Sequence, residues 1–517
     1  MMKKYEIFWL IFMSGISITV GWMYALHQTD VHHWGFITGT ALDHIRGREF
    51  YSDMYVQYGV GQPILFKFLN SFLPVNYTTL GIITDFIYAL NLIVIYLSVK
   101  KLSNALWAIA ITAAALFIHS FPIYPWPDYC AGLLLSLSCY FLIQKKESSE
   151  QYSAILSGVF LFLTFIFRNT YIINFSAAFF AYLVISLVFS QVRNRRIVAM
   201  IGTFFGLVVA YFIFLYFQGN LHAWFLQTLE TGQSKYGVFN IDPILKLLHH
   251  VFIPLKPYLA ANLVTTTWSF LFYLGFYCVW ISVFKKDHAL VKKSKAGTGV
   301  LLLFALMGLA GTIQTMVIWE GFRLQNACSP LYLVFAVFIF CRFPDLTVAW
   351  KNRKFQAAFL IYLVVLAARF PHGSTLWPIY EGSLDSYSES KIPYFKYHRF
   401  KVEEETYYTQ MSKYLCDGHR KIINLTLDST VPFLCEGQKN GLVLPFYIED
   451  LQEKLDPTIV EQVKTGVYTA DEVIVSDSIL VTNPKVKLLQ LGTLIRPAST
   501  RWYGSTPVTI YHVEAQN

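Results

Sequence analysis

Residues 197–217 read IVAMIGTFFGLVVAYFIFLYF and contain no charged side chain. An α-helix needs roughly 20 apolar residues to cross the hydrocarbon core of a bilayer. The run follows Arg193, Arg195 and Arg196, and basic clusters of this kind mark the cytoplasmic end of a transmembrane helix. This stretch therefore predicts a membrane span that begins on the cytoplasmic side.

Similar apolar runs lie on both sides of this one. The first follows Lys3 and Lys4 and lacks a small-residue cleavage site, so we expect a retained span rather than a signal peptide. Together they predict a polytopic α-helical membrane protein with about 11 transmembrane helices. The other runs cover residues 6–26, 79–99, 104–120, 129–143, 152–167, 171–190, 263–284, 298–318, 328–342 and 356–371.

Composition divides the chain into two parts. Of 517 residues, 55% are hydrophobic and only 14% are charged, against roughly 25% charged in soluble proteins, which excludes an ordinary cytosolic enzyme. Residues 372–517 hold 14 basic and 18 acidic residues (net −4), which leaves 27 basic and 14 acidic (net +13) in residues 1–371. We therefore predict a transmembrane domain over 1–371 and a small water-facing α/β domain over 372–517, and no nucleic-acid partner.

The basic residues also predict the orientation. In the membrane region, 18 of the 27 fall in alternate connecting segments, beginning with the N-terminus. The positive-inside rule then places the N-terminus in the cytoplasm and, with an odd number of spans, the C-terminal domain outside it. A bacterial inner membrane suits this arrangement best. The long outer loops are 27–78 and 219–262, and we expect function on their face.

The C-terminal domain contains short β-rich runs and one segment of helical spacing, 448–464, which together predict a mixed α/β fold. Cys416 and Cys435 lie in a compartment that permits disulfides, and the sequence leaves open whether they pair. Asn76 and Asn424 begin possible N-glycosylation motifs, which are relevant only if the protein comes from a eukaryote. The β-rich runs are 422–427, 442–448, 473–475, 486–491 and 508–512.

The first outer loop carries candidate acid–base groups. Asp30 follows the first span, with His32 and His33 behind it, and in an extended segment Asp30 and His32 would share a side. A partly desolvated carboxylate at the membrane surface suits a general base. The alternative is that Asp30 caps a turn and the histidines lie at headgroup level. Asp53 and Tyr58 stand later in the same loop.

Other candidates lie at the ends of later spans. Asp128 follows Pro125-Trp126-Pro127, where the alternative reading is a helix N-cap. Arg168 and Asn169 separate two apolar runs, and Arg323 follows Glu320 by three residues. An arginine fork fits a lipid phosphate, although either arginine could instead be a structural partner of an acid, Arg323 of Glu320. Lys235, in the second outer loop, is a weaker candidate.

This pattern resembles the GT-C membrane glycosyltransferases, such as the aminoarabinose and protein mannosyl transferases. The likeness rests on a first span ending in an acid, a long first outer loop, an outer-edge arginine before a late span and an outer C-terminal domain. The segments Asp30 to Gly35, Gly47 to Asp53 and Gln57-Tyr58-Gly59 carry it at residue level. The resemblance implies a polyprenyl-phosphate sugar donor, attack with inversion, and a glycolipid, polysaccharide or protein acceptor.

The resemblance also implies roles for individual residues. Asp30 would be the general base, and Asp53 or Asp128 a second acid that orients the acceptor or a metal. Arg168 and Arg323 would hold the donor phosphate. Asp30 with Asp128 would suit Mg²⁺ or Mn²⁺, although the histidines beside Asp30 depart from the family pattern and leave the metal open.

Two other functions compete with a transferase. A transporter or flippase for an amphipathic lipid would be expected to carry polar groups near the bilayer midplane, whereas the candidates above lie at span ends. An O-antigen-type polymerase or ligase would share many spans and large outer loops.

Overall fold

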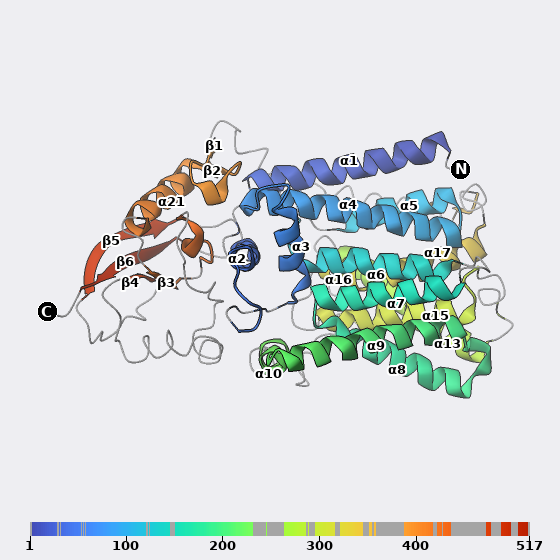
Figure 1. Ribbon diagram of the computed structural model, residues 1–517. Coiled ribbons are helices and arrows are strands. Elements are labelled where there is room, and N and C mark those ends of the chain that lie inside the picture. Colours follow the sequence, from blue (N-terminus) through green and yellow to red (C-terminus); the bar gives the residue numbers. More distant parts are fainter. Residues whose placement is uncertain are drawn as a thin grey trace.

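The computed structural model consists of a bundle of long helices with a smaller domain at one end (Figure 1). It describes residues 3–27, 30, 33–52, 54, 56, 58–119, 123, 125–144, 150–230, 245, 263–285, 288, 295–315, 321–344, 351–353, 356–357, 387–416, 421–426, 428–435, 472–476, 488–497 and 505–514. We call the end of the bundle at which α1 finishes (His27) and α4 begins (Tyr77) the domain end, because it contacts the C-terminal domain.

The bundle is built from helices that run back and forth between the domain end and the opposite end. Every predicted run except 356–371 falls on one of them, and of that run the structure describes only residues 356–357. The helices are α1 (Lys4–His27), α4 (Tyr77–Leu102), α5 (Ala105–Ile118), α6 (Pro127–Ile143), α7 (Glu150–Phe167), α8 (Tyr171–Val188), α9 (Arg195–Phe217), α13 (Leu263–Phe284), α15 (Thr298–Ala310), α16 (Gly321–Ala327) and α17 (Pro330–Arg342).

These helices confirm a polytopic α-helical membrane protein. Within the described part of the chain, seven helices are long and apolar enough to span a bilayer, and the number rises to eight if α16 and α17 form one span. These two helices meet at an angle of 73°, at a break before Pro330. Helices α5 and α6 are apolar but shorter. The predicted count of about 11 spans is not reached by this measure.

Local sequence signals explain where α4 and α6 begin and end. Asn76 caps α4 by accepting from the Thr79 N–H at 2.9 Å, and the Thr79 hydroxyl accepts from the Asn76 N–H at 3.0 Å. This reciprocal capping box satisfies two of the free N–H groups at the helix start. The last turn of α4 carries Lys100 and Lys101, which suit the negative end of the helix dipole. Helix α6 starts with Pro127, whose missing N–H costs nothing there.

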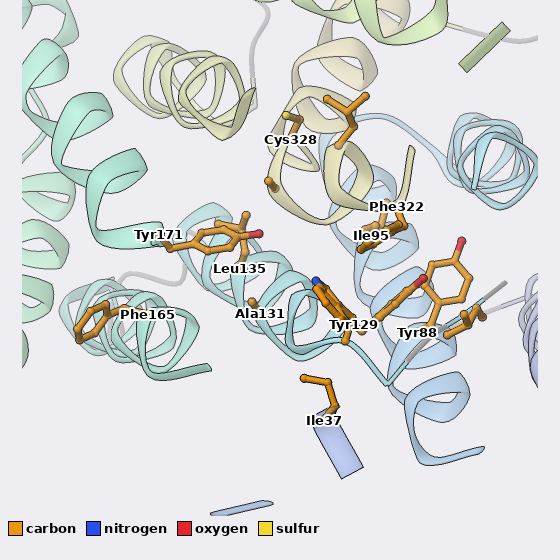
Figure 2. Packing of buried hydrophobic residues seen from close by; sticks show 14 of the residues in the cluster. Ile37, Tyr88, Ile95, Tyr129, Ala131, Leu135, Phe165, Tyr171, Phe322 and Cys328 are labelled. Carbon is orange, nitrogen blue, oxygen red and sulfur yellow. The ribbon is translucent and has the colours of Figure 1, made fainter. Parts of the chain in front are cut away.

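The helices pack through an aromatic core (Figure 2). Tyr129 of α6 stacks on Phe322 of α16, with 6.0 Å between ring centroids, and meets Tyr88 of α4 edge-on at 5.8 Å. All three rings are buried. These contacts hold α4, α6 and α16 together just beneath the domain end, and so set the relative positions of the loops above them.

Short helices occupy the connections at the domain end. They are α2 (His33–Ile45) and α3 (Gly61–Leu69) in the first loop, and α10 (Leu221–Phe225) followed by a π-helical turn (Leu226–Glu230) after α9. The chain is therefore helical from His33 onward, where the sequence had suggested an extended segment. A 3₁₀ turn, Gly311–Thr315, ends α15.

The C-terminal domain has the predicted mixed α/β composition. Its four-stranded sheet has the order β3-β4-β6-β5, in which β3 and β4 are parallel and the other pairs antiparallel. A two-stranded ribbon of β1 and β2 precedes α21, and Cys416 at the end of α21 forms a disulfide with Cys435. The elements are β1 (Tyr387–Glu389), β2 (Arg399–Lys401), α21 (Val402–Leu415), β3 (Lys421–Leu425), β4 (Glu472–Ser476), β5 (Leu488–Arg496) and β6 (Thr506–Val513), with 3₁₀ turns at Pro393–Phe395 and Val431–Phe433.

The sheet agrees with four of the predicted strands. The predicted strand 442–448 and the helical segment 448–464 lie outside the described residues. Helix α21 and the β1–β2 ribbon were not predicted from the sequence.

Candidate functional site

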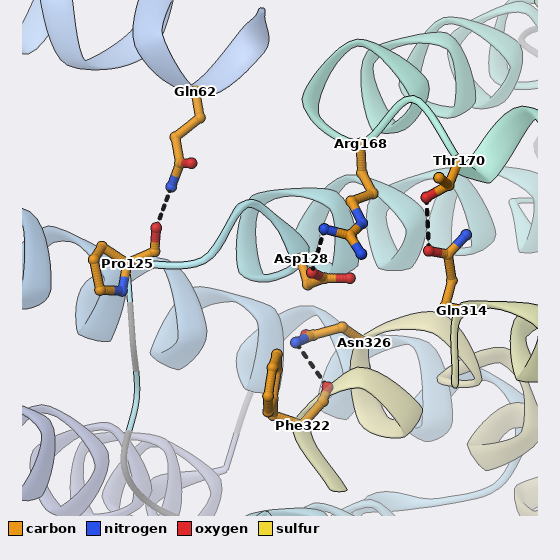
Figure 3. A network of polar contacts seen from close by, with 8 residues as sticks. All are labelled: Gln62, Pro125, Asp128, Arg168, Thr170, Gln314, Phe322 and Asn326. Carbon is orange, nitrogen blue, oxygen red and sulfur yellow. Dashed lines mark hydrogen bonds and ion pairs between the residues drawn. The ribbon is translucent and has the colours of Figure 1, made fainter. Parts of the chain in front are cut away.

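Asp128 and Arg168 form an ion pair at the domain end of the bundle (Figure 3). Arg168 Nη1 lies 3.4 Å from Asp128 Oδ2, and the two side chains are 6% and 0% exposed. Asp128 is the second residue of α6, and Arg168 directly follows α7. Because α6 and α7 pack along each other, the pair joins the ends of two neighbouring helices. The predicted N-cap role of Asp128 is wrong, since Trp126 occupies the N-cap position of α6.

This ion pair has unfilled hydrogen-bonding capacity. Among the described residues, Nε and Nη1 of Arg168 and both carboxylate oxygens of Asp128 are buried without a hydrogen-bond partner. A buried pair needs further hydrogen bonds to offset the loss of hydration. Buried polar atoms without partners are rare in folded proteins. The pair therefore has donors and acceptors available for a ligand.

Two aromatic rings connect Arg168 to Arg323. The Tyr58 and Trp126 ring centroids are 4.8 Å apart. The Arg168 guanidinium lies 4.5 Å from the Tyr58 centroid, and that of Arg323 lies 5.7 Å from the Trp126 centroid. Such cation–π contacts hold a guanidinium in place while leaving its edge able to donate. The structure thus brings together four predicted residues, Tyr58, Asp128, Arg168 and Arg323, around Trp126.

Backbone contacts fasten the first loop to this cluster. The Asn169 N–H donates to the Tyr58 carbonyl at 2.6 Å, and Asn169 Nδ2 donates to Thr228 Oγ1 at 3.1 Å. A side chain added at Gly59 would lie 2.4 Å from the Ile166 carbonyl, so only glycine permits this approach of the loop to α7. In the turn before α6, the Pro125 carbonyl accepts from Gln62 at 2.6 Å. Asn169 therefore positions the loop that carries Tyr58.

Asp30 is held by a different set of residues. Its backbone N–H donates to Tyr77 Oη at 2.7 Å, and its carbonyl accepts from the Gly35 N–H in α2. Trp34 stacks on Tyr77 at 4.8 Å and donates to the Tyr77 carbonyl at 2.6 Å. Asp30 itself is buried. The acid thus lies between the end of α1 and the beginning of α4, beside the C-terminal domain.

Several predicted site residues are not placed by the structure. Asp53, His32, Lys235 and Glu320 lie outside the described residues, as does the side chain of His33. The proposed Glu320–Arg323 pairing, and any role of Asp53 as a second acid, stay predictions.

The predicted metal ligands do not form a cation site with the residues that the structure describes. Asp128 faces Arg168, whose positive charge already pairs with the carboxylate that a metal ion would need as a ligand. Within the described ranges, no three His, Cys, Asp or Glu side chains are grouped for ligation. A Mg²⁺ or Mn²⁺ ion at Asp30 and Asp128 therefore stays a prediction.

Two residues of the site were missed as functional groups in the sequence. Tyr77 was considered only as the middle residue of the possible glycosylation motif Asn76-Tyr77-Thr78. Asn76 of that motif is buried and caps α4. Asn424 of the second motif is buried and donates to the Asp428 carbonyl. Neither asparagine is open to glycosylation in this structure. Trp126 stood in a Pro-Trp-Pro turn that suggested only rigidity. An aromatic residue held between prolines beside an acid is the signal that could have identified it.

The comparisons with known proteins concern the fold. No protein-family model and no curated protein match the sequence. Among solved structures, the chain is similar to ArnT from Cupriavidus metallidurans bound to undecaprenyl phosphate, with a TM-score of 0.53 and 12% identity over 97% of this chain and 98% of that one. It is also similar to the oligosaccharyltransferase AglB from Archaeoglobus fulgidus in complex with an inhibitory peptide and a dolichol-phosphate, with a TM-score of 0.46 and 11% identity over 92% of this chain and 70% of that one. The likeness to ArnT over nearly the whole of both chains confirms that this protein has the GT-C fold.

Proposed function

We propose that this protein is an integral membrane glycosyltransferase that moves a sugar from a polyprenyl-phosphate donor to an extracytoplasmic acceptor. One observation carries the proposal. The buried pair of Arg168 and Asp128 has unfilled hydrogen-bonding capacity, and it lies at the domain end beside Arg323. A lipid-linked phosphate supplies the anionic oxygens that these donors lack. The GT-C fold is consistent with this assignment, and the ArnT structure of the same fold holds undecaprenyl phosphate.

The two arginines have the chemistry that this reaction requires. Transfer breaks the bond between the anomeric carbon and the donor phosphate, so negative charge develops on the phosphate as it leaves. Donors held in place before the reaction stabilise that charge at no cost of reorganisation. We assign this role to Arg168 and Arg323, with Asp128 orienting Arg168. Tyr58 and Trp126 hold the guanidinium planes through cation–π contacts.

Asp30 is the proposed general base. It would take the proton of the acceptor hydroxyl as that oxygen attacks the anomeric carbon on the side opposite the phosphate, which inverts the configuration. The backbone of Asp30 is fixed by Tyr77, whose hydroxyl accepts from the Asp30 N–H at 2.7 Å. Asp53 is kept as a candidate second acid, and no step here depends on a metal.

The charge distribution supports an extracytoplasmic site. Lys100 and Lys101 end α4, and Arg195 and Arg196 begin α9, all at the end of the bundle opposite Asp128. Basic residues concentrate on the cytoplasmic side of membrane proteins. The domain end, with Asp30 and Arg168, then faces the compartment that lipid-linked donors reach. Glycolipid, polysaccharide and protein acceptors all fit the proposal.

A direct test uses purified protein in nanodiscs. It is incubated with a panel of hexoses and pentoses linked to undecaprenyl phosphate, together with a bacterial envelope lipid extract as acceptor. We expect one donor to release undecaprenyl phosphate and transfer its sugar, as detected by mass spectrometry. Arg168→Ala should lose this activity. Arg196→Ala is the matched control, because Arg196 also binds buried groups, such as the Leu142 carbonyl at 2.9 Å, but lies at the opposite end.

Two results would contradict the proposal. One is binding of undecaprenyl phosphate that is equally strong in wild type and Arg168→Ala. The other is a sugar donor that is turned over at the wild-type rate by Arg168→Ala.

One observation keeps lipid transport as a second candidate. Helix α4 carries Asp85 and Asn91, both buried inside the span, and neither oxygen of Asp85 has a hydrogen-bond partner among the described residues. At 1.5 Å per residue, Asn91 lies about 21 Å below the start of α4, near the middle of the bilayer. Transport of labelled undecaprenyl phosphate across liposomes, lost in Asp85→Asn while no sugar is transferred, would favour this candidate over a transferase.

A further inference from the structure

We infer that the C-terminal domain positions Asp30, and that His398 is the residue through which it acts. This inference rests on the proposed role of Asp30 as general base. The juxtaposition that carries it is a set of aromatic side chains from residues 387–398, with Phe395 and His398 buried, that contact the end of α1 and Tyr77 on either side of Asp30.

The first contact is with the end of α1. His398 is fully buried, and its Nδ1 lies 3.1 Å from the Ala25 carbonyl. Ala25 is in the last turn of α1, where backbone carbonyls have no partner within the helix. Because a carbonyl only accepts, Nδ1 is the donor. His27, two residues further on, meets Tyr387 edge-on at 5.2 Å. The domain therefore fixes the point at which the chain leaves α1 toward Asp30.

The second contact is with the beginning of α4. The Tyr77 ring is fully buried, with His398 at 5.0 Å and Phe395 at 5.2 Å between ring centroids. Trp34 of α2 stacks on the same ring at 4.8 Å. Rings enclosed in this way cannot turn without moving their neighbours. The Tyr77 hydroxyl, which accepts from the Asp30 N–H, is thus held in place from the C-terminal domain.

The domain also contacts α2 directly. A side chain at Gly35 would lie 2.8 Å from Thr430 Cγ2, so α2 and the Thr430 turn approach within van der Waals contact. That turn is rigid, because Asp428 accepts from Thr430 and from Tyr408 Oη at 2.8 Å. Asp428 is fully buried. The C-terminal domain therefore contacts the chain at three places around Asp30. These are Ala25 before it, Gly35 after it, and Tyr77, which accepts the hydrogen bond from its backbone.

The test uses the full chain in nanodiscs and measures two quantities. His398→Phe keeps a ring against Tyr77 but removes the donor to Ala25, whereas His398→Asn keeps a donor close to the position of Nδ1. Tyr77→Phe keeps the ring and removes the acceptor of the Asp30 N–H. Thr506→Val is the control, because it removes a hydrogen bond within the C-terminal sheet, from Arg496 at 2.7 Å, and lies outside the three contacts described above.

The first quantity is amide hydrogen exchange of peptides covering residues 28–36, which requires no substrate. Loss of one buried hydrogen bond should accelerate exchange there about tenfold in His398→Phe and Tyr77→Phe. His398→Asn should restore protection, and Thr506→Val should leave it unchanged. Unchanged exchange in both His398→Phe and Tyr77→Phe would overturn the inference, whatever Asp30 does in catalysis.

The second quantity is turnover of the sugar donor identified from the undecaprenyl phosphate panel. We expect kcat to fall about tenfold in His398→Phe with an unchanged KM for the donor, since the arginine cluster is intact. His398→Asn should recover kcat. If exchange rises but kcat does not fall while Asp30→Asn is inactive, the positioning role is refuted and the base role stands. If Asp30→Asn is fully active, the base role and this inference both fail.

Discussion

Arg168 Nη1 and Asp128 Oδ2 form an ion pair at 3.4 Å, and within the described residues neither oxygen of this carboxylate has a hydrogen-bond partner. The pair balances its own charge, yet the guanidinium keeps unused donors. Under the proposed function, a donor phosphate would bind Arg168 without first displacing Asp128.

Removing the negative charge of Asp128 should destabilise the folded protein. Asp128→Asn leaves the Arg168 charge buried without its partner, which we expect to cost about 3–5 kcal/mol in the free energy of unfolding. Undecaprenyl phosphate should recover part of that loss, because it supplies a replacement anion. The melting temperature, measured with and without this lipid, should rise more in Asp128→Asn than in wild type. Equal shifts in the two proteins would mean that the lipid does not bind at Arg168.

Arg323 should act on the donor rather than on the acceptor. It lies over Trp126 at the edge of the cluster and is half-buried, so Arg323→Ala removes one of two positive charges near the proposed phosphate. A charge-assisted hydrogen bond contributes about 1.5–3 kcal/mol, so the KM for the donor should rise about tenfold or more. The KM for the acceptor should stay the same. Steady-state kinetics with each substrate varied in turn measures both, and an unchanged donor KM refutes the phosphate role.

Asp30→Asn should abolish sugar transfer while the protein still folds. Tyr77 binds the backbone of Asp30, so the substitution leaves that hydrogen bond intact. Loss of a general base typically lowers kcat by about 10²–10⁴-fold. Asp43→Asn in the same loop is the control, because Asp43 pairs with Arg48 at 3.6 Å, away from the proposed chemistry. Wild-type transfer by Asp30→Asn would remove this residue from the mechanism.

His398 should make the folded protein sensitive to acid. Burial lowers the pKa of His398 to about 3, from an ordinary value of 6.5. Below pH 6.5 the unfolded chain binds a proton that the folded chain does not, so stability falls as the pH falls toward 3. The slope is at most about 1.4 kcal/mol per pH unit. Melting curves between pH 7.5 and 4.5 should show a smaller decline in His398→Asn than in wild type, and parallel curves would contradict this.

The spans were predictable because they rest on a local property. Runs such as 197–217 must be helical to satisfy their backbone in lipid, whatever surrounds them. Helix α21 escaped prediction, since its polar surface and the buried Tyr407 and Tyr408 give a weak apolar pattern. The disulfide between Cys416 and Cys435 was undecided for a similar reason, because pairing depends on distance in the fold.

The site was predicted as separate residues but not as an arrangement. Asp128 and Arg168 are 40 positions apart, and only the packing of α6 against α7 brings them together. The sequence favoured nearer partners, such as an N-cap role for Asp128. The contact between Tyr77 and His398 spans more than 300 residues, so no local pattern could reveal it. Sequence spacing identifies candidate groups, whereas tertiary packing decides which of them meet.

The contacts of residues 387–398 with Ala25 and Tyr77 also order the events of biosynthesis. Domains form from the N-terminal side as the chain is made, so α1 and α4 enter the membrane long before His398 leaves the ribosome. Until then, Tyr77 lacks its contacts with Phe395 and His398, and the Asp30 backbone is held only by residues of the N-terminal helices. A chain interrupted after α17 would carry every described span and still lack residues 387–398, so the contacts with Ala25 and Tyr77 form only after the last described span has been made.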